Sequence, residues 1–250
     1  MTGRFPEGPG TRRLEGVPIV AKKKAPVKKK RPRETPEARK ARAASILRML
    51  RKEFPSASTA LEHRDAFQLL IATILSAQCT DERVNMVTKD LFAKYRTAAE
   101  FAAVPQAVLE KEIRSTGFFR MKAKSIIACS KGLLERHGGA VPDRMEALVQ
   151  LAGVGRKTAN VVLGQAFGIA SGVVVDTHVH RLSRRLGFTE ADTPEKIEID
   201  LMALVPKKDW IECGSILILH GRRTCKARTP DCPGCPVNEL CPSANDFPPA

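Results

Sequence analysis

The chain has 250 residues, of which 43% are hydrophobic, and this is enough for one large or two modest domains with a real core. A formal net charge of +15 at pH 7 predicts a polyanionic partner, either nucleic acid or an acidic membrane surface. The sequence has no apolar run of about 18 residues, the length that indicates a membrane-spanning helix. It also lacks the apolar segment of a secretory signal near its start, so we expect a globular protein inside the cell with no membrane partner.

Much of the charge is concentrated at the N-terminus. Residues 1–33 hold eleven Lys and Arg against two Glu, an excess of +9 that leaves +6 for the rest of the chain. This stretch is also rich in Pro and Gly and has little that could form a core, which predicts a disordered basic tail. The tail raises non-specific DNA affinity, serves as an address signal, or has no specific role, and the sequence leaves these alternatives open.

The first folded segments have clear helical patterns. Thr35 is a good N-cap for a helix over residues 36–54, with Pro in its first turn. The segment Ala66–Gln78 is apolar on nearly every side, which predicts a helix buried in a bundle. Another helix is expected from Asp81 towards Tyr95.

The rest of the chain has the same helical character. Apolar residues at helical spacing predict further helices over residues 98–102, 105–114, 121–136, 176–186, 193–206 and 210–221. No segment sustains the alternation that is typical of a strand, and the run Val173–Val175 is too short to seed a sheet. The pattern therefore predicts an all-α fold.

One stretch, Leu151–Asn160, reads as a glycine hairpin between two helices. Asp143 is expected to cap the short helix before it, and Gly153 and Gly155 mark the reversal, where a tight turn needs positive φ and backbone amides must approach a ligand closely. The amides and the start of the second helix would form an anion site, for which a DNA phosphate is the natural occupant. The alternative is an ordinary antiparallel helix pair joined by a Gly-x-Gly loop.

Four of the seven cysteines lie within 17 residues near the C-terminus. They are Cys225, Cys232, Cys235 and Cys241, with the spacing C-x6-C-x2-C-x5-C. Because nothing indicates export, disulfides are not expected, which leaves a structural zinc site or an iron-sulfur cluster. Zinc ribbons usually present two C-x2-C pairs on separate turns, so a single irregular loop that supplies all four thiolates favours a cluster. The other cysteines, at positions 79, 129 and 213, lie on apolar helices and are expected to be buried thiols.

Three features in this order resemble the endonuclease III family of helix-hairpin-helix DNA repair proteins: Gly-Val-Gly followed by Arg156-Lys157, then Asp176 in Val-Asp-Thr-His, then the four-cysteine loop. The resemblance covers about residues 36–242. It implies two helical domains with a DNA cleft between them: a six-helix domain over residues 62–171, and a [4Fe-4S] cluster domain made of residues 34–61 together with 172–250.

The resemblance also implies a bifunctional DNA glycosylase and abasic-site lyase of base excision repair, acting on oxidised pyrimidines. In that reading Lys157 attacks C1′ of the damaged nucleotide, expels the base and forms a Schiff base, and β-elimination then cleaves the strand. The helix dipole, burial and nearby Arg156 are expected to favour the free amine of Lys157. Asp176 would assist the nucleophile and stabilise positive charge on the sugar. The plainer alternatives are a phosphate clamp for Lys157 and a simple N-cap for Asp176.

Several residues are expected to contact DNA. A base inside the duplex must be flipped out, and the resemblance assigns Gln78 to the vacated space. Phe118 stands where the family usually has a Leu wedge, with Phe119 as the alternative. His178 is expected to contact DNA or shape the pocket, although a structural role is the plainer reading.

The remaining expected contacts are to phosphates, through Gly153, Gly155 and Arg156 in the hairpin and through Lys226 and Arg228 in the cysteine loop. The expected partner is double-stranded DNA with a damaged base or an abasic site, bound by a monomer that lies with the nucleoid if the source is bacterial. Two alternatives remain: a monofunctional mismatch glycosylase of the same superfamily, and a non-enzymatic DNA-binding module that holds zinc.

Overall fold

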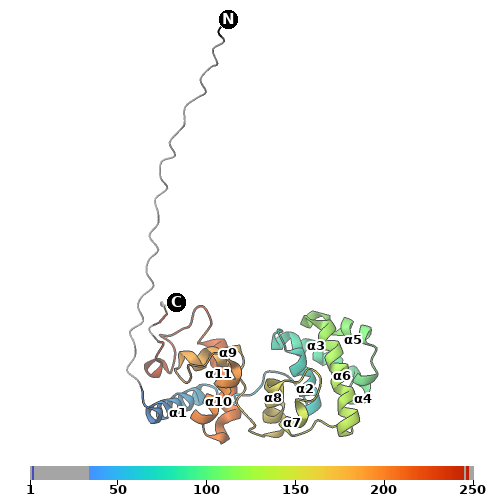
Figure 1. Cartoon of the computed structure of the whole chain (residues 1–250), viewed down its shortest axis with the longest axis horizontal. Coiled ribbons are helices and arrows are strands. Elements are labelled where there is room, and N and C mark those ends of the chain that lie inside the picture. The colour runs from blue at the N-terminus through green and yellow to red at the C-terminus, as the bar shows by residue number, and fades with distance from the viewer. Residues whose placement is uncertain (1, 3–33, 245, 248–250) are drawn as a thin grey trace. The chain divides into compact units, whose positions relative to one another are not determined.

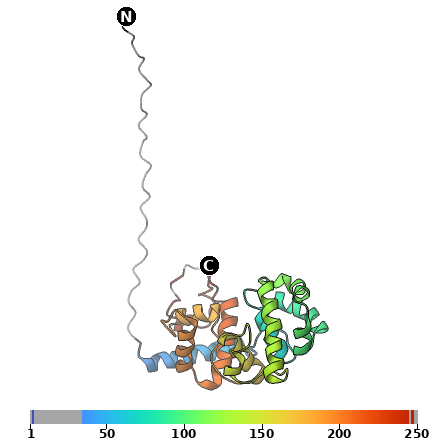
Figure 2. The same ribbon diagram turned by 45° about the vertical axis from the view of Figure 1, so that its right-hand side comes forward.

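The computed structural model describes residue 2, residues 34–244 and residues 246–247. Every regular element in this part of the chain is a helix and none is a strand, which confirms the predicted all-α fold (Figure 1; Figure 2). The basic tail predicted for residues 1–33 lies, apart from residue 2, outside the described residues. None of the described helices is both long enough and apolar enough to cross a bilayer.

The helices follow one another closely along the chain. They are α1 (Pro36–Glu53), α2 (Ala66–Leu75), α3 (Asp81–Lys94), α4 (Ala98–Ala103), α5 (Gln106–Glu112), the 3-10 turn η1 (Arg114–Thr116), α6 (Phe119–His137), α7 (Met145–Leu148), α8 (Arg156–Phe167), α9 (Thr177–Arg185), α10 (Pro194–Leu204), η2 (Lys207–Asp209), α11 (Trp210–Arg223) and η3 (Asn238–Leu240).

Polar N-caps set several helix starts, as the sequence predicts. The Thr35 hydroxyl accepts a hydrogen bond from the backbone N of Ala38 at 3.2 Å, and Pro36 occupies the first turn of α1. Thr193 caps α10 in the same way. Asp143 does not cap α7, which is a correction: the N-cap position is Arg144, with no side-chain cap from any described residue.

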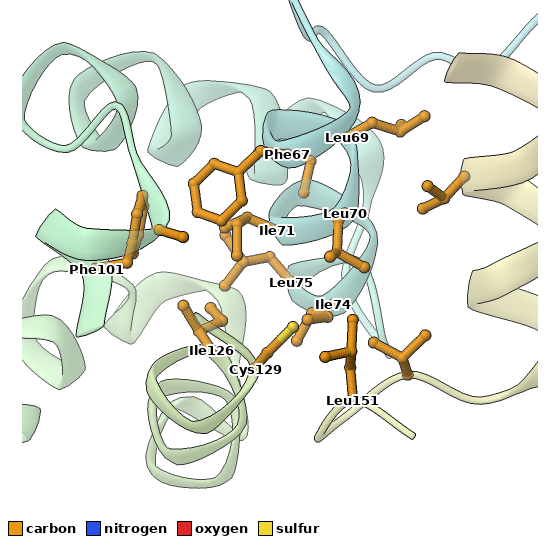
Figure 3. Close-up of a cluster of buried hydrophobic side chains, with 14 of the residues drawn as sticks. Phe67, Leu69, Leu70, Ile71, Ile74, Leu75, Phe101, Ile126, Cys129 and Leu151 are labelled. Atoms are coloured by element: carbon orange, nitrogen blue, oxygen red, sulfur yellow. The ribbon is translucent and has the colours of Figure 1, made fainter. Parts of the chain in front are cut away.

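The first hydrophobic core surrounds α2. Nine of its ten residues are buried, as expected for a helix apolar on nearly every side. Helices α3, α6 and α8 pack against it, and Figure 3 shows Phe67, Ile71 and Leu75 of α2 facing Phe101 and Ile126. The helix ends at Leu75 and not at Gln78, so the polar residues that follow belong to a loop.

A second hydrophobic core is built by helices that are distant in the sequence. Ile46 and Leu50 of α1 pack with Leu182 of α9, Leu201 of α10 and Leu217 of α11. Figure 1 shows these four helices gathered together, with α2 to α8 forming the other group. Residues 34–244 therefore contain two separate hydrophobic cores.

Candidate active site

A pocket with an empty volume of about 710 Å³ lies where the two groups of helices meet. Thr73 and Ser76 of the α2 end and Val161 of α8 line it from the first group. Ile218 and Arg222 of α11 line it from the second. Lys157 and Asp176 both lie in its wall, so the structure brings together the two residues predicted to carry the chemistry.

Lys157 is the second residue of α8 and its side chain is exposed. This corrects the expectation that apolar neighbours bury it. The residue lies at the positive end of α8. Exposure in the wall of an open pocket also means that a ligand can reach the amine without rearrangement of the core.

Asp176 is the N-cap of α9, as the sequence predicts. One carboxylate oxygen accepts hydrogen bonds from the backbone N of His178 and of Val179, each at 2.8 Å. These two bonds and the positive end of the helix hold the carboxylate at the pocket wall. The residue is a cap and also a pocket residue.

The hairpin before α8 uses its two glycines differently. Gly153 has a φ of +76°, and a Cβ there would lie 2.8 Å from Ser125 Cβ, so only glycine fits. Gly155 has a φ of −90°, and a Cβ there would meet nothing within 4 Å, so the expectation of positive φ is wrong for this residue. Gly155 is the N-cap of α8, and none of the described side chains caps that helix. Its first-turn amides are consequently available to an anion.

Arg156 makes a bidentate ion pair with Glu198 of α10. Its Nε lies 2.7 Å from Oε2 and its Nη2 lies 3.0 Å from Oε1. Asn160 of α8 donates to the same carboxylate at 2.8 Å. The Arg156 guanidinium, which the sequence predicts to contact a DNA phosphate, is thus held by a carboxylate at the start of α8.

An ion pair that sequence reasoning missed crosses the pocket. Arg222 of α11 lies 2.7 Å from the carboxylate of Asp81 at the start of α3, and both side chains line the pocket with Lys157 and Asp176. Asp81 was expected only to open a helix. The two residues are far apart in the sequence, and no local pattern pairs them.

Gln78 and Phe118 share an uncommon backbone conformation. Their φ angles are +52° and +47°, and they are the only non-glycine residues with positive φ in the described part of the chain. Gln78 is exposed and the Phe118 side chain is 60% exposed, whereas Phe119 packs against the first core. Of the two wedge candidates, Phe118 is therefore the more exposed.

His178 does not line the pocket of Lys157 and Asp176. It is half-buried, with Nδ1 at 3.3 Å from Nη2 of Arg181, and burial lowers its pKa despite the opposing effect of Asp176. Arg181 also donates to the carbonyls of Gly221 and Cys225. The surroundings of His178 are those of a packed structural residue.

The four C-terminal cysteines line a second pocket, with an empty volume of about 360 Å³. Arg185 of α9 donates to Cys225 Sγ at 3.3 Å, and His220 Nε2 lies 3.5 Å from Cys235 Sγ. Burial raises the pKa of Cys235 to about 11. Among the described residues, no three His, Cys, Asp or Glu side chains are arranged to hold one metal ion.

Lys226 and Arg228 are exposed in the loop that follows Cys225. Arg185 fixes the backbone there, because its guanidinium donates to the carbonyls of Lys226 and Ala227, each at 2.7 Å. The two basic side chains thus project from an anchored loop. Of the other cysteines, Cys129 and Cys213 are buried as expected, and Cys79 is half-buried.

Comparison with known proteins agrees with this geometry. The model of the HhH-GPD superfamily of base excision DNA repair proteins matches residues 71–207, which include Lys157 and Asp176. Endonuclease III of Synechocystis sp. is 53% identical over 207 residues, which cover 83% of this chain and 94% of that protein. The chain belongs to the endonuclease III family.

Two further comparisons agree. Endonuclease III of Bacillus subtilis is 48% identical over 75% of this chain and 86% of its own length. A solved structure of a trapped endonuclease III-DNA covalent intermediate superposes with a TM-score of 0.80 at 46% identity, covering 83% of this chain and 97% of that chain. As a member of the endonuclease III family, the protein is a DNA-binding enzyme of base excision repair, a DNA glycosylase and abasic-site lyase. The non-enzymatic alternative is thereby excluded.

Proposed function

We propose that the protein removes oxidised pyrimidines from duplex DNA and cleaves the strand at the resulting abasic site, with Lys157 as nucleophile and Asp176 as its electrostatic partner. The observation that carries this proposal is that both side chains line one open pocket between the two hydrophobic cores. A flipped nucleotide can enter such a pocket, and a base inside the duplex cannot be reached otherwise.

The chemistry balances with these two residues. The neutral amine of Lys157 attacks C1′, the glycosidic bond breaks, and its electrons leave with the base, which takes up a proton. The amine gives one proton to the departing base and the other to O4′ as the C1′–O4′ bond breaks and the sugar ring opens, leaving an imine between Nζ and C1′. Removal of a proton from C2′ expels the 3′ phosphate by β-elimination, and water hydrolyses the imine to restore the lysine. The Asp176 carboxylate stabilises the positive charge that develops on the sugar.

The two residues with positive φ are our candidates for the DNA-penetrating contacts. Gln78 would occupy the space of the flipped nucleotide, and the exposed ring of Phe118 would wedge between neighbouring bases. Phosphate binding would fall to the uncapped start of α8 after Gly153 and Gly155, and to Lys226 and Arg228. The ion pair with Glu198 uses Nε and Nη2 of Arg156, so a phosphate contact would fall to the other donors of this half-exposed guanidinium. His178 would shape the pocket without lining it.

The four cysteines fit a [4Fe-4S] cluster better than a single ion. They line one pocket, yet no three described ligand side chains are close enough together to hold one metal ion. Four thiolates from one loop are the donor set that a [4Fe-4S] cluster takes, and Arg185 and His220 lie beside two of the sulfurs. Cys225, Cys232, Cys235 and Cys241 would hold the cluster, which would fix the loop that carries Lys226. It would take no part in the base or sugar chemistry.

The two hydrophobic cores support a division into two domains. We assign residues 62–171 to one domain, and residues 34–61 with 172–250 to the other, with DNA bound between them by a monomer. Because chromosomal DNA is the substrate, the protein would work inside the cell, with the nucleoid in a bacterium.

A duplex with one thymine glycol tests the proposed substrate. The protein should release the oxidised base and leave a nicked strand, whereas a mismatched adenine should not be released. Excision of the mismatched adenine alone, without strand cleavage, would support the monofunctional alternative instead. Metal analysis of the same preparation should give iron and sulfide, and a colourless protein with one zinc would overturn the cluster assignment.

A further inference from the structure

A buried lysine that the chemistry does not use connects the two loops with positive φ. Lys122 lies in the first turn of α6, and only 5% of it is exposed. Its ammonium donates to the carbonyl of Leu75 and to the carbonyl of Thr116, each at 2.7 Å. Burial lowers the pKa of Lys122, with the nearby Cys79 acting in the opposite direction.

Both carbonyls stand at the end of a helical element. Leu75 is the last residue of α2, and Thr116 is the last residue of η1. Carbonyls at helix ends have no partner within the helix and need another donor. A single side chain from α6 satisfies both, and so fixes the distance between the two helix ends.

The two chain segments that leave these carbonyls lead directly to the candidate DNA-penetrating residues. Gln78 follows Leu75 by three positions, and Phe118 follows Thr116 by two. The left-handed region is strained for a non-glycine residue, so each of these conformations needs its surroundings to hold it. The Lys122 ammonium is the contact that the two segments share.

The face of α6 on which Lys122 lies is otherwise apolar. Ile126, Cys129 and Leu133 follow Lys122 at spacings of four, three and four, on the same face of α6, and all three are fully buried. An apolar residue at position 122 would continue that face without the cost of burying an ammonium group, but it would take the donor away from the carbonyls of Leu75 and Thr116. The ammonium group of Lys122 lies where it links the loop that carries Gln78 to the loop that carries Phe118.

We propose that Lys122 is a positioning residue that holds Gln78 and Phe118 at the separation needed to enter the base stack together. It touches neither the substrate nor Lys157. The inference rests on the proposed function, because it assigns a common support to the two residues placed there in contact with DNA. Without this tie the loops would move independently, and duplex DNA would be bound but not opened.

The test compares Lys122→Met with Lys131→Met, which removes an exposed lysine from the same helix. Excision of thymine glycol from duplex DNA under single-turnover conditions should fall about a hundredfold in Lys122→Met, the scale expected of a small misplacement. Cleavage of an abasic site in single-stranded DNA, which has no base stack to open, should stay within about twofold of the parent protein. Lys131→Met should match the parent protein in both assays.

A binding measurement separates this inference from the proposed chemistry. With 2-aminopurine beside the lesion, the parent protein should raise the fluorescence of bound duplex, and Lys122→Met should bind without raising it. A parent protein that unstacks the base and cleaves nothing would contradict the proposed function alone. Equal loss of single-stranded and duplex activity in Lys122→Met, or no loss in either, would overturn the positioning role. If Lys122→Met does not fold, Lys122→Gln takes its place, with the same pattern expected.

Discussion

The guanidinium of Arg156 and the carboxylate of Glu198 join the start of α8 to α10 through two parallel hydrogen bonds, at 2.7 Å and 3.0 Å. Lys157 is the next residue in α8, so this pair orients the helix turn that carries the proposed nucleophile. Glu198 is buried, whereas the Arg156 side chain is about half exposed. The pair is therefore partly screened by solvent.

Glu198→Gln should destabilise the protein. The substitution removes the negative charge that holds Arg156 and turns one acceptor oxygen into an NH2 group that faces the guanidinium. The free energy of unfolding should therefore fall by about 1–2 kcal/mol after allowance for screening. Urea unfolding measures the change, with the exposed Glu190→Gln as control. A loss equal to that of the control would mean that the pair contributes nothing to stability.

Substitutions at Asp176 separate capping from catalysis. Asn is as good an N-cap as Asp, so Asp176→Asn should leave stability nearly unchanged while base excision falls strongly with the lost charge. Asp176→Ala should lose the same activity and also about 1 kcal/mol of stability. Full excision activity in Asp176→Asn would reduce this residue to a cap.

The two adjacent phenylalanines should respond in opposite ways. Phe118→Ala should keep the stability of the parent protein, because the ring is exposed, but lose base unstacking and duplex excision. Phe119→Ala should lower the melting temperature, because that ring packs against the first core. Thermal unfolding and excision rates measured on both variants check this assignment, which the opposite pattern would reverse.

Charge reversal in the cysteine loop should change the salt dependence of DNA binding. Each phosphate contact contributes about 0.9 to the slope of log K against log salt, so Lys226→Glu or Arg228→Glu should flatten the slope by at least that amount. Lys208→Glu, at an exposed position of η2, serves as the control. Slopes equal to the control would remove Lys226 and Arg228 from the interface.

Local features of the fold could be predicted from the sequence. Thr35 and Asp176 cap helices as expected, because a cap depends on residues within one turn. Asp143 failed as a cap because α7 is a single turn that starts one residue later. Gly155 failed as a positive-φ residue because the reversal is completed at Gly153.

Contacts between distant segments could not be predicted in the same way. The pairs Arg222–Asp81 and Arg156–Glu198 join helices whose packing no local pattern specifies. The exposure of Lys157 also depends on the open pocket and not on its apolar neighbours in the sequence. Lys122 is different, because it occupies an apolar position in the helical periodicity of α6. A lysine at such a position indicates a buried ammonium group that needs hydrogen-bond acceptors.

The central claim is that Lys157 forms a covalent imine with the sugar. Borohydride reduction during reaction with a duplex that contains one abasic site tests it directly, with the parent protein, Lys157→Ala and the control Lys131→Ala side by side. We expect a covalent protein-DNA adduct with the parent protein and with Lys131→Ala, and none with Lys157→Ala. An adduct of undiminished yield in folded Lys157→Ala, or no adduct in the parent protein, would contradict it.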